Sequence, residues 1–311
     1  MLKSNLQVDM LDQEPELMGP EDFVKWESAE ASIKNDPSDR TTTLWSQGVD
    51  KNTIRLENFK ILKLLGRGGF GKVVLCQKDA DKKLYAMKIL RKKDIVESDQ
   101  VEHTKSEKAI LTHVNHPFLV SLDCAFQNKR KIYFVMELMR GGEIYTHLAQ
   151  VRRFKEKQAK FFSACICLAL GHLHANSFIY RDLKLENILL DSLGYAKLTD
   201  FGLSKFLRKD EKTHTVCGTI FYIAPEIISN KGYSYEADWW SLGILTYELL
   251  FGFPPFYSKN HRVLMKVIKE GNLVFHEKYP ISDEAKDFIS KVRNFYQKSK
   301  NLKRGAEIAR R

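Results

Sequence analysis

A dense group of polar residues occupies positions 180–187, directly after a long apolar helical pattern. The group contains one candidate base, Asp182, the two cations Arg181 and Lys184, and the amide of Asn187. Loops at the end of a rigid helix are common positions for catalytic groups. The pattern therefore predicts a catalytic loop in which Asp182 is the candidate base.

A short hairpin pattern follows this loop and determines which residue lies beside it. Residues 188–190 and 195–198 read as two short strands joined by a turn. The hairpin folds the chain back, so Asp200 is expected close to Asp182 and Asn187. Clustered carboxylate and amide oxygens, with no His or Cys among them, suit Mg²⁺ bound together with substrate phosphates. An isolated aspartate is more often a turn or N-cap residue, so the metal site is predicted from the conjunction of the three.

A glycine-rich turn at 66–73 fits the pattern G-x-G-x-x-G-x-V. Glycines allow a backbone to lie close over phosphates with its amide groups free to donate hydrogen bonds. The pattern alone is weak, because glycine-rich turns occur in many folds. Its context is more informative, since a dinucleotide-binding loop opens a helix and this loop runs from one strand pattern into another. The context disfavours a dinucleotide-binding fold.

One lysine and one glutamate interrupt otherwise apolar patterns downstream of this turn. Ala86 and Lys88 share a face of the third strand pattern, because side chains two apart point the same way. Glu107 precedes Ile110 and Leu111 by three and four residues, which places its carboxylate on the apolar face of a helix. A carboxylate in that position requires a cation, and Lys88 is the candidate. The alternative is that the two residues occupy these positions by coincidence and have no shared role.

The elements that must position these residues change in type along the chain. Alternation predicts strands at 59–65, 72–77, 83–90 and 132–137, with a helix at 101–114. Helical patterns then occupy 142–150, 156–175, 237–251 and 261–270. This order predicts an α+β fold with a small, strand-rich N-terminal lobe followed by a larger helical lobe.

The first 55 residues differ in charge from the rest of the chain. They carry 11 acidic and 6 basic side chains, whereas the remainder carries 44 basic and 28 acidic ones. They are rich in turns, apart from a short helical pattern at 21–33 in which Phe23 and Trp26 are expected to pack on the main domain. The basic side chains of the remainder are dispersed and do not alternate with aromatic residues, so they read as a solvated surface and no nucleic-acid partner is expected.

Composition and cysteine usage limit the class of protein. The 311 residues, 43% of them hydrophobic, are sufficient for a substantial core. No apolar run approaches the roughly 20 residues of a membrane-spanning helix, and the first residues lack the apolar block of a signal peptide. The five cysteines have scattered spacings, which suits a reducing compartment and disfavours structural zinc. A cytosolic or nuclear location is expected.

Taken together, these motifs resemble those of the eukaryotic protein kinases. Tyr180 in place of the commoner His before Arg181 and Asp182, the whole run YRDLKLEN at 180–187, and the run DWWS at 238–241 are similar to the AGC group. That group includes cyclic-AMP-dependent protein kinase, protein kinase C and Akt. The similarity extends from about residue 59 to about residue 292. It implies a domain at 59–311 with a five-stranded antiparallel sheet and one main helix in the N-lobe and a mainly helical C-lobe, preceded by an acidic extension at 1–58.

The resemblance also implies a role for each matching residue. Asp182 accepts the proton of the substrate hydroxyl, and Lys184, typical of serine/threonine kinases, neutralises charge on the transferring phosphoryl group. Asn187 and Asp200 hold Mg²⁺, while Lys88, braced by Glu107, contacts the α- and β-phosphates of ATP. Met136 is the expected gatekeeper, and Glu137 begins the hinge beside adenine. The expected nucleotide-binding positions are Leu65, Gly66, Arg67, Gly68, Gly69, Phe70, Gly71, Lys72, Val73, Ala86, Lys88, Glu107, Met136 and Glu137.

Regulation and substrate choice follow from the same resemblance. Thr215 matches the phosphorylated threonine of AGC kinases, with Thr213 as a neighbouring alternative, and its phosphate is expected to pair with Arg181. An upstream kinase would then be a partner. Glu143, Glu186 and Glu248 match acidic positions that receive arginines upstream of the target residue. The expected partners are therefore protein substrates with basic residues near the modified serine or threonine.

Two features depart from the family pattern. Ile220 and Phe221 stand where the family usually has Pro-Glu, which puts details of the substrate pocket in question. Lysines near 298–300 stand where an arginine usually pairs with the glutamate of Ala-Pro-Glu, and no C-terminal tail with an aromatic motif follows. One alternative is therefore a kinase-like protein that binds nucleotide or partners but catalyses poorly. Another is an incomplete gene product.

Overall fold

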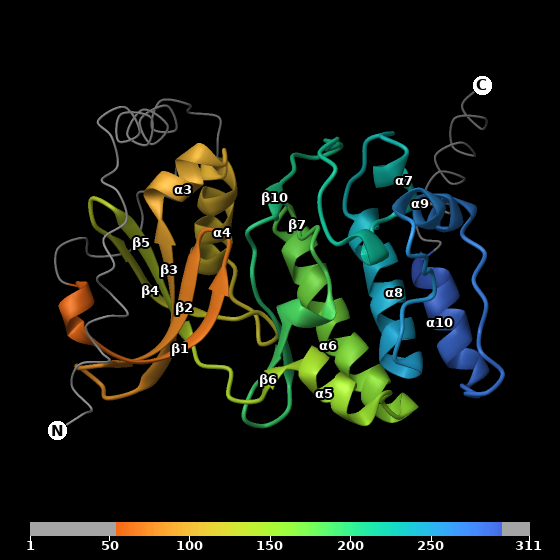
Figure 1. The fold of residues 1–311 in the computed structure, drawn as a ribbon, viewed down its shortest axis with the longest axis horizontal. Coiled ribbons are helices and arrows are strands. Elements are labelled where there is room, and N and C mark those ends of the chain that lie inside the picture. The colour runs from red at the N-terminus through yellow and green to blue at the C-terminus, as the bar shows by residue number, and fades with distance from the viewer. Residues whose placement is uncertain (1–53, 294–311) are drawn as a thin grey trace. The chain divides into compact units, whose positions relative to one another are not determined.

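The computed structural model describes residues 54–293, so the helix expected at 21–33 and the lysines near 298–300 lie outside the described part of the chain. The described residues form two compact units (Figure 1). The N-terminal unit comprises residues 54–115 and 120–139. The C-terminal unit comprises residues 116–119 and 140–293. Each unit positions its own group of polar residues.

The N-terminal unit is built on a five-stranded antiparallel sheet with the strand order β1-β2-β3-β5-β4. Its strands are β1 (Phe59–Gly68), β2 (Gly71–Lys78), β3 (Leu84–Arg91), β4 (Leu122–Gln127) and β5 (Lys131–Glu137). The short helix η1 (Leu56–Asn58) precedes β1, and α3 (Lys92–Glu97) and α4 (Val101–His113) follow β3. The expected five-stranded sheet is confirmed. Only four of its strands had been located from their patterns, because β4 alternates weakly, and α3 is too short to show a helical period.

The core of the N-terminal unit lies on one face of β3. Met87 and Ile89 are buried there, and the intervening Lys88 points to the opposite face. The core contains Phe59, Val74, Cys76, Met87, Ile89, Cys124, Tyr133 and Val135. Ile54 and Leu56, which the sequence prediction places in the N-terminal extension, pack against it. The strand is therefore fixed by its apolar face, which leaves its other face for Lys88.

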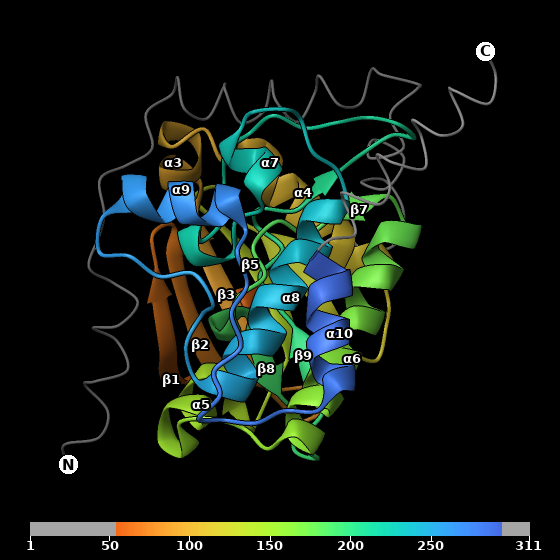
Figure 2. The same ribbon diagram turned by 90° about the vertical axis from the view of Figure 1, so that its right-hand side faces the viewer.

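The C-terminal unit is mainly helical. Its helices are α5 (Ile144–Val151), α6 (Glu156–Ala175), α7 (Pro225–Ile228), α8 (Glu236–Phe251), α9 (His261–Glu270) and α10 (Asp283–Arg293), with η2 (Leu185–Asn187) and η3 (Ile220–Tyr222). Helices α6, α8 and α10 lie side by side, as Figures 1 and 2 show from two directions. Helix α8 is apolar around most of its circumference, which is typical of a helix buried on several sides.

Short strands in this unit correct one sequence prediction. The helix predicted at 142–150 begins only at Ile144, because Gly142 and Glu143 form strand β6 (Gly142–Glu143). Gly142 has φ 73°, a conformation that glycine adopts at little cost, and this residue turns the chain into the strand. Strand β6 pairs with the predicted hairpin, β8 (Ile188–Leu190) and β9 (Ala196–Leu198), in a three-stranded sheet. A second small sheet pairs β7 (Phe178–Ile179) with β10 (Lys205–Phe206).

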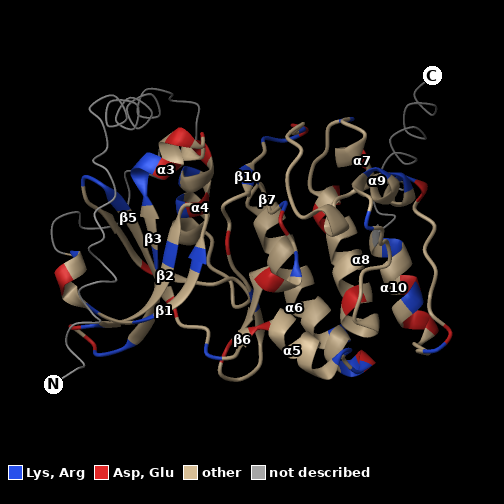
Figure 3. Cartoon of the chain, in the orientation of Figure 1, with Lys and Arg blue, Asp and Glu red and all other residues tan. Residues whose placement is uncertain are grey.

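Lysines and arginines are dispersed over the elements of each unit and are not gathered on a single helix (Figure 3). All five cysteines are free thiols. Among the described residues, every helix is too short or too polar to cross a bilayer.

Candidate active site

The glycine-rich turn connects β1 to β2 in the N-terminal unit. Gly68 pairs with Gly71 at its tip. Side chains added at Gly66, Gly68 or Gly69 would meet nothing within 4 Å, so the backbone there is open to a ligand. A Cβ at Gly71 would instead lie 1.9 Å from the carbonyl oxygen of Ile89, so β2 requires glycine to approach β3. The turn is an open backbone cradle, which fits a phosphate group.

Basic side chains surround this turn. Burial lowers the pKa of Lys72 on β2, and the neighbouring charges of Lys131 and Arg67 lower it further. A lysine whose charged form is disfavoured in this way is stabilised by an anion. The positive potential beside the glycine-rich turn therefore also suits the phosphates of a nucleotide.

Lys88 and Glu107 form an ion pair within the N-terminal unit. The Nζ of Lys88 on β3 lies 2.6 Å from Oε1 of Glu107 on α4. The side chain of Glu107 is 4% exposed and that of Lys88 is 19% exposed. Burial of the carboxylate makes the pair sensitive to removal of either partner. The lysine is thereby held in a fixed position on the face of β3 away from the core.

The remaining nucleotide-site candidates of this unit lie on neighbouring strands. Ala86 on β3 stands opposite Met136 on β5, and Tyr85 stands opposite Glu137. The Oε1 atom of Glu137 accepts a hydrogen bond of 2.8 Å from the backbone of Ser121. The structure places Leu65, Gly66, Arg67 and Gly68 on β1, Gly69 and Phe70 in the turn, Gly71, Lys72 and Val73 on β2, Ala86 and Lys88 on β3, Glu107 on α4, and Met136 and Glu137 on β5.

In the C-terminal unit, the carboxylate of Asp182 accepts hydrogen bonds from three side chains. Its Oδ2 lies 2.8 Å from Nζ of Lys184 and 3.0 Å from Nδ2 of Asn187. Its Oδ1 accepts a hydrogen bond of 3.2 Å from the hydroxyl of Thr219. These donors fix the orientation of the carboxylate and so the direction from which it can accept a proton. Asp182 is 8% exposed, so the arrangement is shielded from water.

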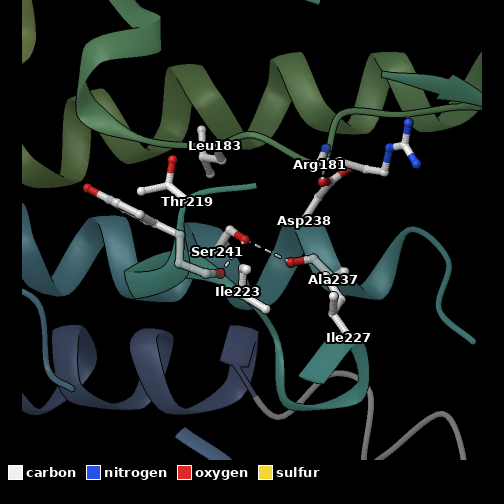
Figure 4. Close-up of a pocket in the computed structure, with 9 residues that line it drawn as sticks. Arg181, Leu183, Thr219, Ile223, Ile227, Ala237, Asp238 and Ser241 are labelled. Atoms are coloured by element: carbon white, nitrogen blue, oxygen red, sulfur yellow. Dashed lines mark hydrogen bonds between the residues drawn. The ribbon is translucent and has the colours of Figure 1, made fainter. Parts of the chain in front are cut away.

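A second carboxylate holds the backbone of the same loop. Asp238, at the start of α8 and 1% exposed, accepts hydrogen bonds of 2.8 Å from the backbone amides of Tyr180 and Arg181 and one of 2.7 Å from His174. Figure 4 shows Asp238 beside the backbone of Arg181, whose guanidinium extends away from it. Arg181 has φ 72°, a left-handed conformation that costs about 1–2 kcal/mol in a residue other than glycine. The bonds to Asp238 offset that cost.

The residues around Asp200 complete this group. The backbone amide of Thr199 donates to the carbonyl of Asn187 at 3.0 Å, which sets the following residue beside the loop. The buried hydroxyl of Tyr180 donates to the carbonyl of Thr199 at 2.6 Å. Burial raises the pKa of Tyr180, and the charges of Asp182 and Asp200 raise it further. The structure thus brings Asp182, Asn187 and Asp200 into one region of the C-terminal unit.

The donor atoms in this region fit a magnesium ion. Asn187 uses its Nδ2 toward Asp182, so its amide oxygen is the atom left to face a metal. Asp200 adds carboxylate oxygens. Its backbone has φ 56°, a left-handed conformation that turns the chain at this residue. Oxygen ligands from one or two side chains, completed by water and substrate phosphates, are what Mg²⁺ prefers.

A family model described as a protein kinase domain matches residues 59–301. The chain belongs to the protein kinase family. The RAC serine/threonine-protein kinase of Drosophila melanogaster is 46% identical over 265 residues, which cover 84% of this chain and 42% of that protein. Protein kinase 2 of Dictyostelium discoideum is 47% identical over 242 residues, 77% of this chain and 50% of that protein. The cAMP-dependent protein kinase type 3 of Saccharomyces cerevisiae is 42% identical over 254 residues, 81% of this chain and 63% of that protein.

These relatives confirm the resemblance to the AGC group of serine/threonine protein kinases. The chain spans about half the length of the curated relatives it matches.

The segment of this chain between Asp200 and Pro225 contains both candidate threonines, in different environments. Thr213 is 2% exposed, and its backbone pairs with that of Tyr233. Thr215 is exposed, and its carbonyl accepts a hydrogen bond of 2.6 Å from the hydroxyl of Tyr233. Arg181 is 7% exposed, and its Nη1 is buried without a hydrogen-bond partner. A buried guanidinium nitrogen in this state is a ready donor for an anion.

Two of the three glutamates expected to bind substrate arginines interact with each other. The hydroxyl of Tyr222 donates to Oε2 of Glu248 on α8. Burial raises the pKa of Glu248; the Tyr222 hydrogen bond lowers it and the charge of Glu186 raises it. A partly buried carboxylate beside a second carboxylate gains from a bound cation. Glu143 lies on β6, opposite Leu189 of β8.

Sequence reasoning had assigned no chemical role to Asp238, Thr219 or Tyr222. Asp238 carries a usable signal, because a carboxylate in a helix as apolar as α8 must find buried donors. Thr219 and Tyr222 carry no such signal, since their partners Asp182 and Glu248 lie 37 and 26 residues away. Thr219 and Tyr222 also line a small pocket beside the loop at 180–187, together with Arg181, Leu183, Ile223, Ile227, Ala237, Asp238 and Ser241 (Figure 4).

Proposed function

We propose that this chain transfers the γ-phosphate of ATP to serine and threonine hydroxyls of proteins. The observation that carries the proposal is the carboxylate of Asp182, held by Lys184, Asn187 and Thr219 in a loop that Asp238 braces. Phosphoryl transfer depends mainly on positioning and on neutralising charge. An aspartate fixed in position, with a lysine 2.8 Å away, supplies both functions.

Each residue has a defined part in the reaction. Asp182 accepts the proton of the substrate hydroxyl and orients its oxygen toward the γ-phosphorus. Lys184 neutralises charge on the transferring phosphoryl group. Lys88, positioned by Glu107, contacts the α- and β-phosphates, and the amides of the glycine-rich turn support the same group. Asn187 and Asp200 would hold Mg²⁺, which would supply charge neutralisation at the phosphate oxygens.

The proposal extends to activation through Thr215. Thr215 is exposed to an upstream kinase, whereas the 2% exposure of Thr213 keeps its hydroxyl from solvent. A phosphate on Thr215 would offer acceptors to the buried Nη1 of Arg181, and that pairing orders the segment. Because Arg181 adjoins Asp182, this order reaches the catalytic carboxylate directly.

The activation step is tested with Thr215→Ala, purified from cells that phosphorylate the wild-type chain. Turnover of the variant is expected to fall sharply, while His214→Ala, at the exposed neighbouring position, retains wild-type turnover. Mass spectrometry of the wild-type chain should find phosphate on Thr215. Unchanged turnover in Thr215→Ala, or phosphate found on Thr213 instead, would contradict the proposal.

The proposal for substrate class is a protein with arginine near the modified serine or threonine. The support for it is the half-buried Glu248, with its raised pKa, beside the exposed Glu186. A guanidinium bound there offsets both the burial of one carboxylate and its repulsion by the other. A peptide library that shows no preference for arginine would remove this part of the proposal.

The activity itself is tested by Mg-ATP-dependent phosphorylation of an arginine-containing serine peptide. The Asp182→Asn variant keeps the shape of the loop and is expected to lower kcat by roughly 100- to 10,000-fold. A peptide with alanine in place of arginine controls for substrate class. Binding of ATP with transfer no faster than in Asp182→Asn would instead favour a kinase-like protein that binds nucleotide without catalysis.

A further inference from the structure

The aromatic ring of Phe221 stacks on a ring from a distant part of the C-terminal unit. Its centroid lies 6.0 Å from that of Tyr257, and the two ring planes differ by 10°. Phe221 is half-buried, and Tyr257 is 64% exposed. Phe221 is also the residue that stands where the family pattern has a glutamate. The pair therefore replaces a carboxylate with an accessible aromatic surface.

The position of this pair relates it to the proposed arginine site. Phe221 directly precedes Tyr222 in η3, and the hydroxyl of Tyr222 donates to Glu248. Adjacent residues lie about 3.8 Å apart along the backbone. A peptide whose arginine reaches Glu248 consequently passes close to Phe221 and its partner Tyr257.

The surroundings of the pair determine which side chain it can bind. The two segments that carry it, 212–225 and 252–265, contain no aspartate or glutamate. They do contain the exposed cations Lys212, Lys259 and Arg262. The carboxylate of Glu248, bonded to the adjacent Tyr222, is occupied by the arginine in this proposal, and the two segments themselves carry only positive charge, so the stacked rings offer a second cation little. A large apolar side chain gains from burying the exposed face of Tyr257 and the edge of Phe221.

We propose that Phe221 and Tyr257 form a specificity site for a large apolar side chain of the protein substrate. The inference rests on the proposed kinase activity and deepens it, because it adds a second selected position to a peptide already selected for arginine. Phe221 and Tyr257 are specificity-determining residues and take no part in phosphoryl transfer.

The test is a position-scanning library built on one arginine-containing serine peptide, phosphorylated by the full chain. Leucine or phenylalanine at one position is expected to raise kcat/KM by about 3- to 10-fold over alanine at that position. In Phe221→Glu this preference is expected to disappear, and arginine at the same position becomes favoured. Tyr257→Ala should lose the apolar preference without gaining one for arginine.

The matched control is Leu193→Glu, which adds the same charge at an 81% exposed apolar position in the same unit. Its library profile should equal that of the wild-type chain. A wild-type profile that prefers arginine over leucine at every selected position would overturn the inference, as would an apolar preference that survives in both Phe221→Glu and Tyr257→Ala. Absence of phosphorylation on every peptide would instead contradict the proposed kinase activity, so the two failures are distinguishable.

Discussion

Each unit contains a lysine–carboxylate ion pair among its candidate site residues. The two pairs have nearly the same N–O distance, but they differ in the elements and hydrogen bonds that hold them in place. Lys88 and Glu107 lie 2.6 Å apart, and Lys184 and Asp182 lie 2.8 Å apart. The first pair joins a strand to a helix. The second joins residues two positions apart in one loop. The first therefore depends on where α4 lies against β3, whereas the geometry of the second is largely local.

The additional hydrogen bonds of the second pair sharpen this difference. Asp182 also accepts from Asn187 and Thr219, and the loop backbone is bonded to Asp238. Any displacement of α4 changes the distance from Lys88 to Glu107, and kinases require that pair to be in place for catalysis. The N-terminal pair thus depends on the position of one helix, whereas the C-terminal carboxylate is held by several separate hydrogen bonds.

The largest effect is expected from breaking the support of the C-terminal network. Asp238→Ala leaves the backbone donors of Tyr180 and Arg181 and the side chain of His174 without their acceptor. Buried donors that lose an acceptor cost about 1–3 kcal/mol each, so the free energy of unfolding should fall by about 3–5 kcal/mol. A shift of the loop by about 1 Å would lower kcat by roughly 100-fold.

Urea unfolding and peptide phosphorylation measure the two effects separately. Asp238→Asn retains one acceptor oxygen and should recover part of both. Asp283→Ala, which removes an exposed carboxylate from α10, should leave the unfolding midpoint unchanged. A wild-type kcat in Asp238→Ala would show that the loop holds its shape without this carboxylate.

A smaller effect is expected from the N-terminal pair, with a different signature. Glu107→Leu and Lys88→Met should each lower the free energy of unfolding by about 2–3 kcal/mol, because the remaining charge loses its partner. The double variant Lys88→Met/Glu107→Leu replaces both charges with apolar groups and should recover most of that loss. All three variants should lose activity.

The double-mutant cycle from urea unfolding measures the coupling between the two residues. A coupling energy of at least about 1 kcal/mol is expected for a pair in direct contact. Strictly additive losses would mean that Lys88 and Glu107 contribute to stability independently. The proposed difference between this pair, which two apolar side chains can replace, and the hydrogen bonds around Asp182 and Asp238 would then be wrong.

The two pairs also differ in how far the sequence could predict them. The pairing of Lys88 with Glu107 follows from periodicity, since Glu107 occupies an apolar helical face and Lys88 interrupts an apolar strand. The partners of Asp182 could be inferred only in part, because Asn187 lies five residues away and Thr219 lies 37 residues away. Local spacing encodes the first contact and gives no indication of the second.

Elements with weak local patterns were the ones that sequence reasoning missed or misplaced. Residues 142 and 143 read as helix, but pairing with β8 draws them into a strand, a contact of about 50 residues' separation. Stacking of Phe221 on Tyr257 likewise depends on the fold of the C-terminal unit. Tertiary contact decides the conformation wherever local preference is slight.

The smallest effect on activity is expected from substitution of Glu248, which belongs to neither ion pair. This substitution tests whether binding of the substrate arginine can be changed without disturbing either pair. Burial holds the pKa of Glu248 above its ordinary value, so the carboxylate gains a proton at a pH where an exposed glutamate stays charged. The protonated form cannot pair with a guanidinium. The KM for an arginine peptide should therefore rise as the pH falls through this raised pKa. Glu248→Gln should raise KM about 10-fold at neutral pH and abolish that part of the pH dependence.

Stability should move in the opposite direction with pH. Because the folded-state pKa is raised, the folded chain binds the extra proton, and the contribution of Glu248 to stability is present at low pH and lost as the pH rises through the raised pKa. Glu248→Gln, which can still accept from Tyr222, should remove that loss from thermal unfolding curves. Glu277→Gln, at an exposed position, should behave as the wild-type chain in both measurements. A KM for the arginine peptide with the same pH profile in Glu248→Gln as in the wild-type chain would place the guanidinium elsewhere, and the substrate site would then have to be sought around Glu143 and Glu186.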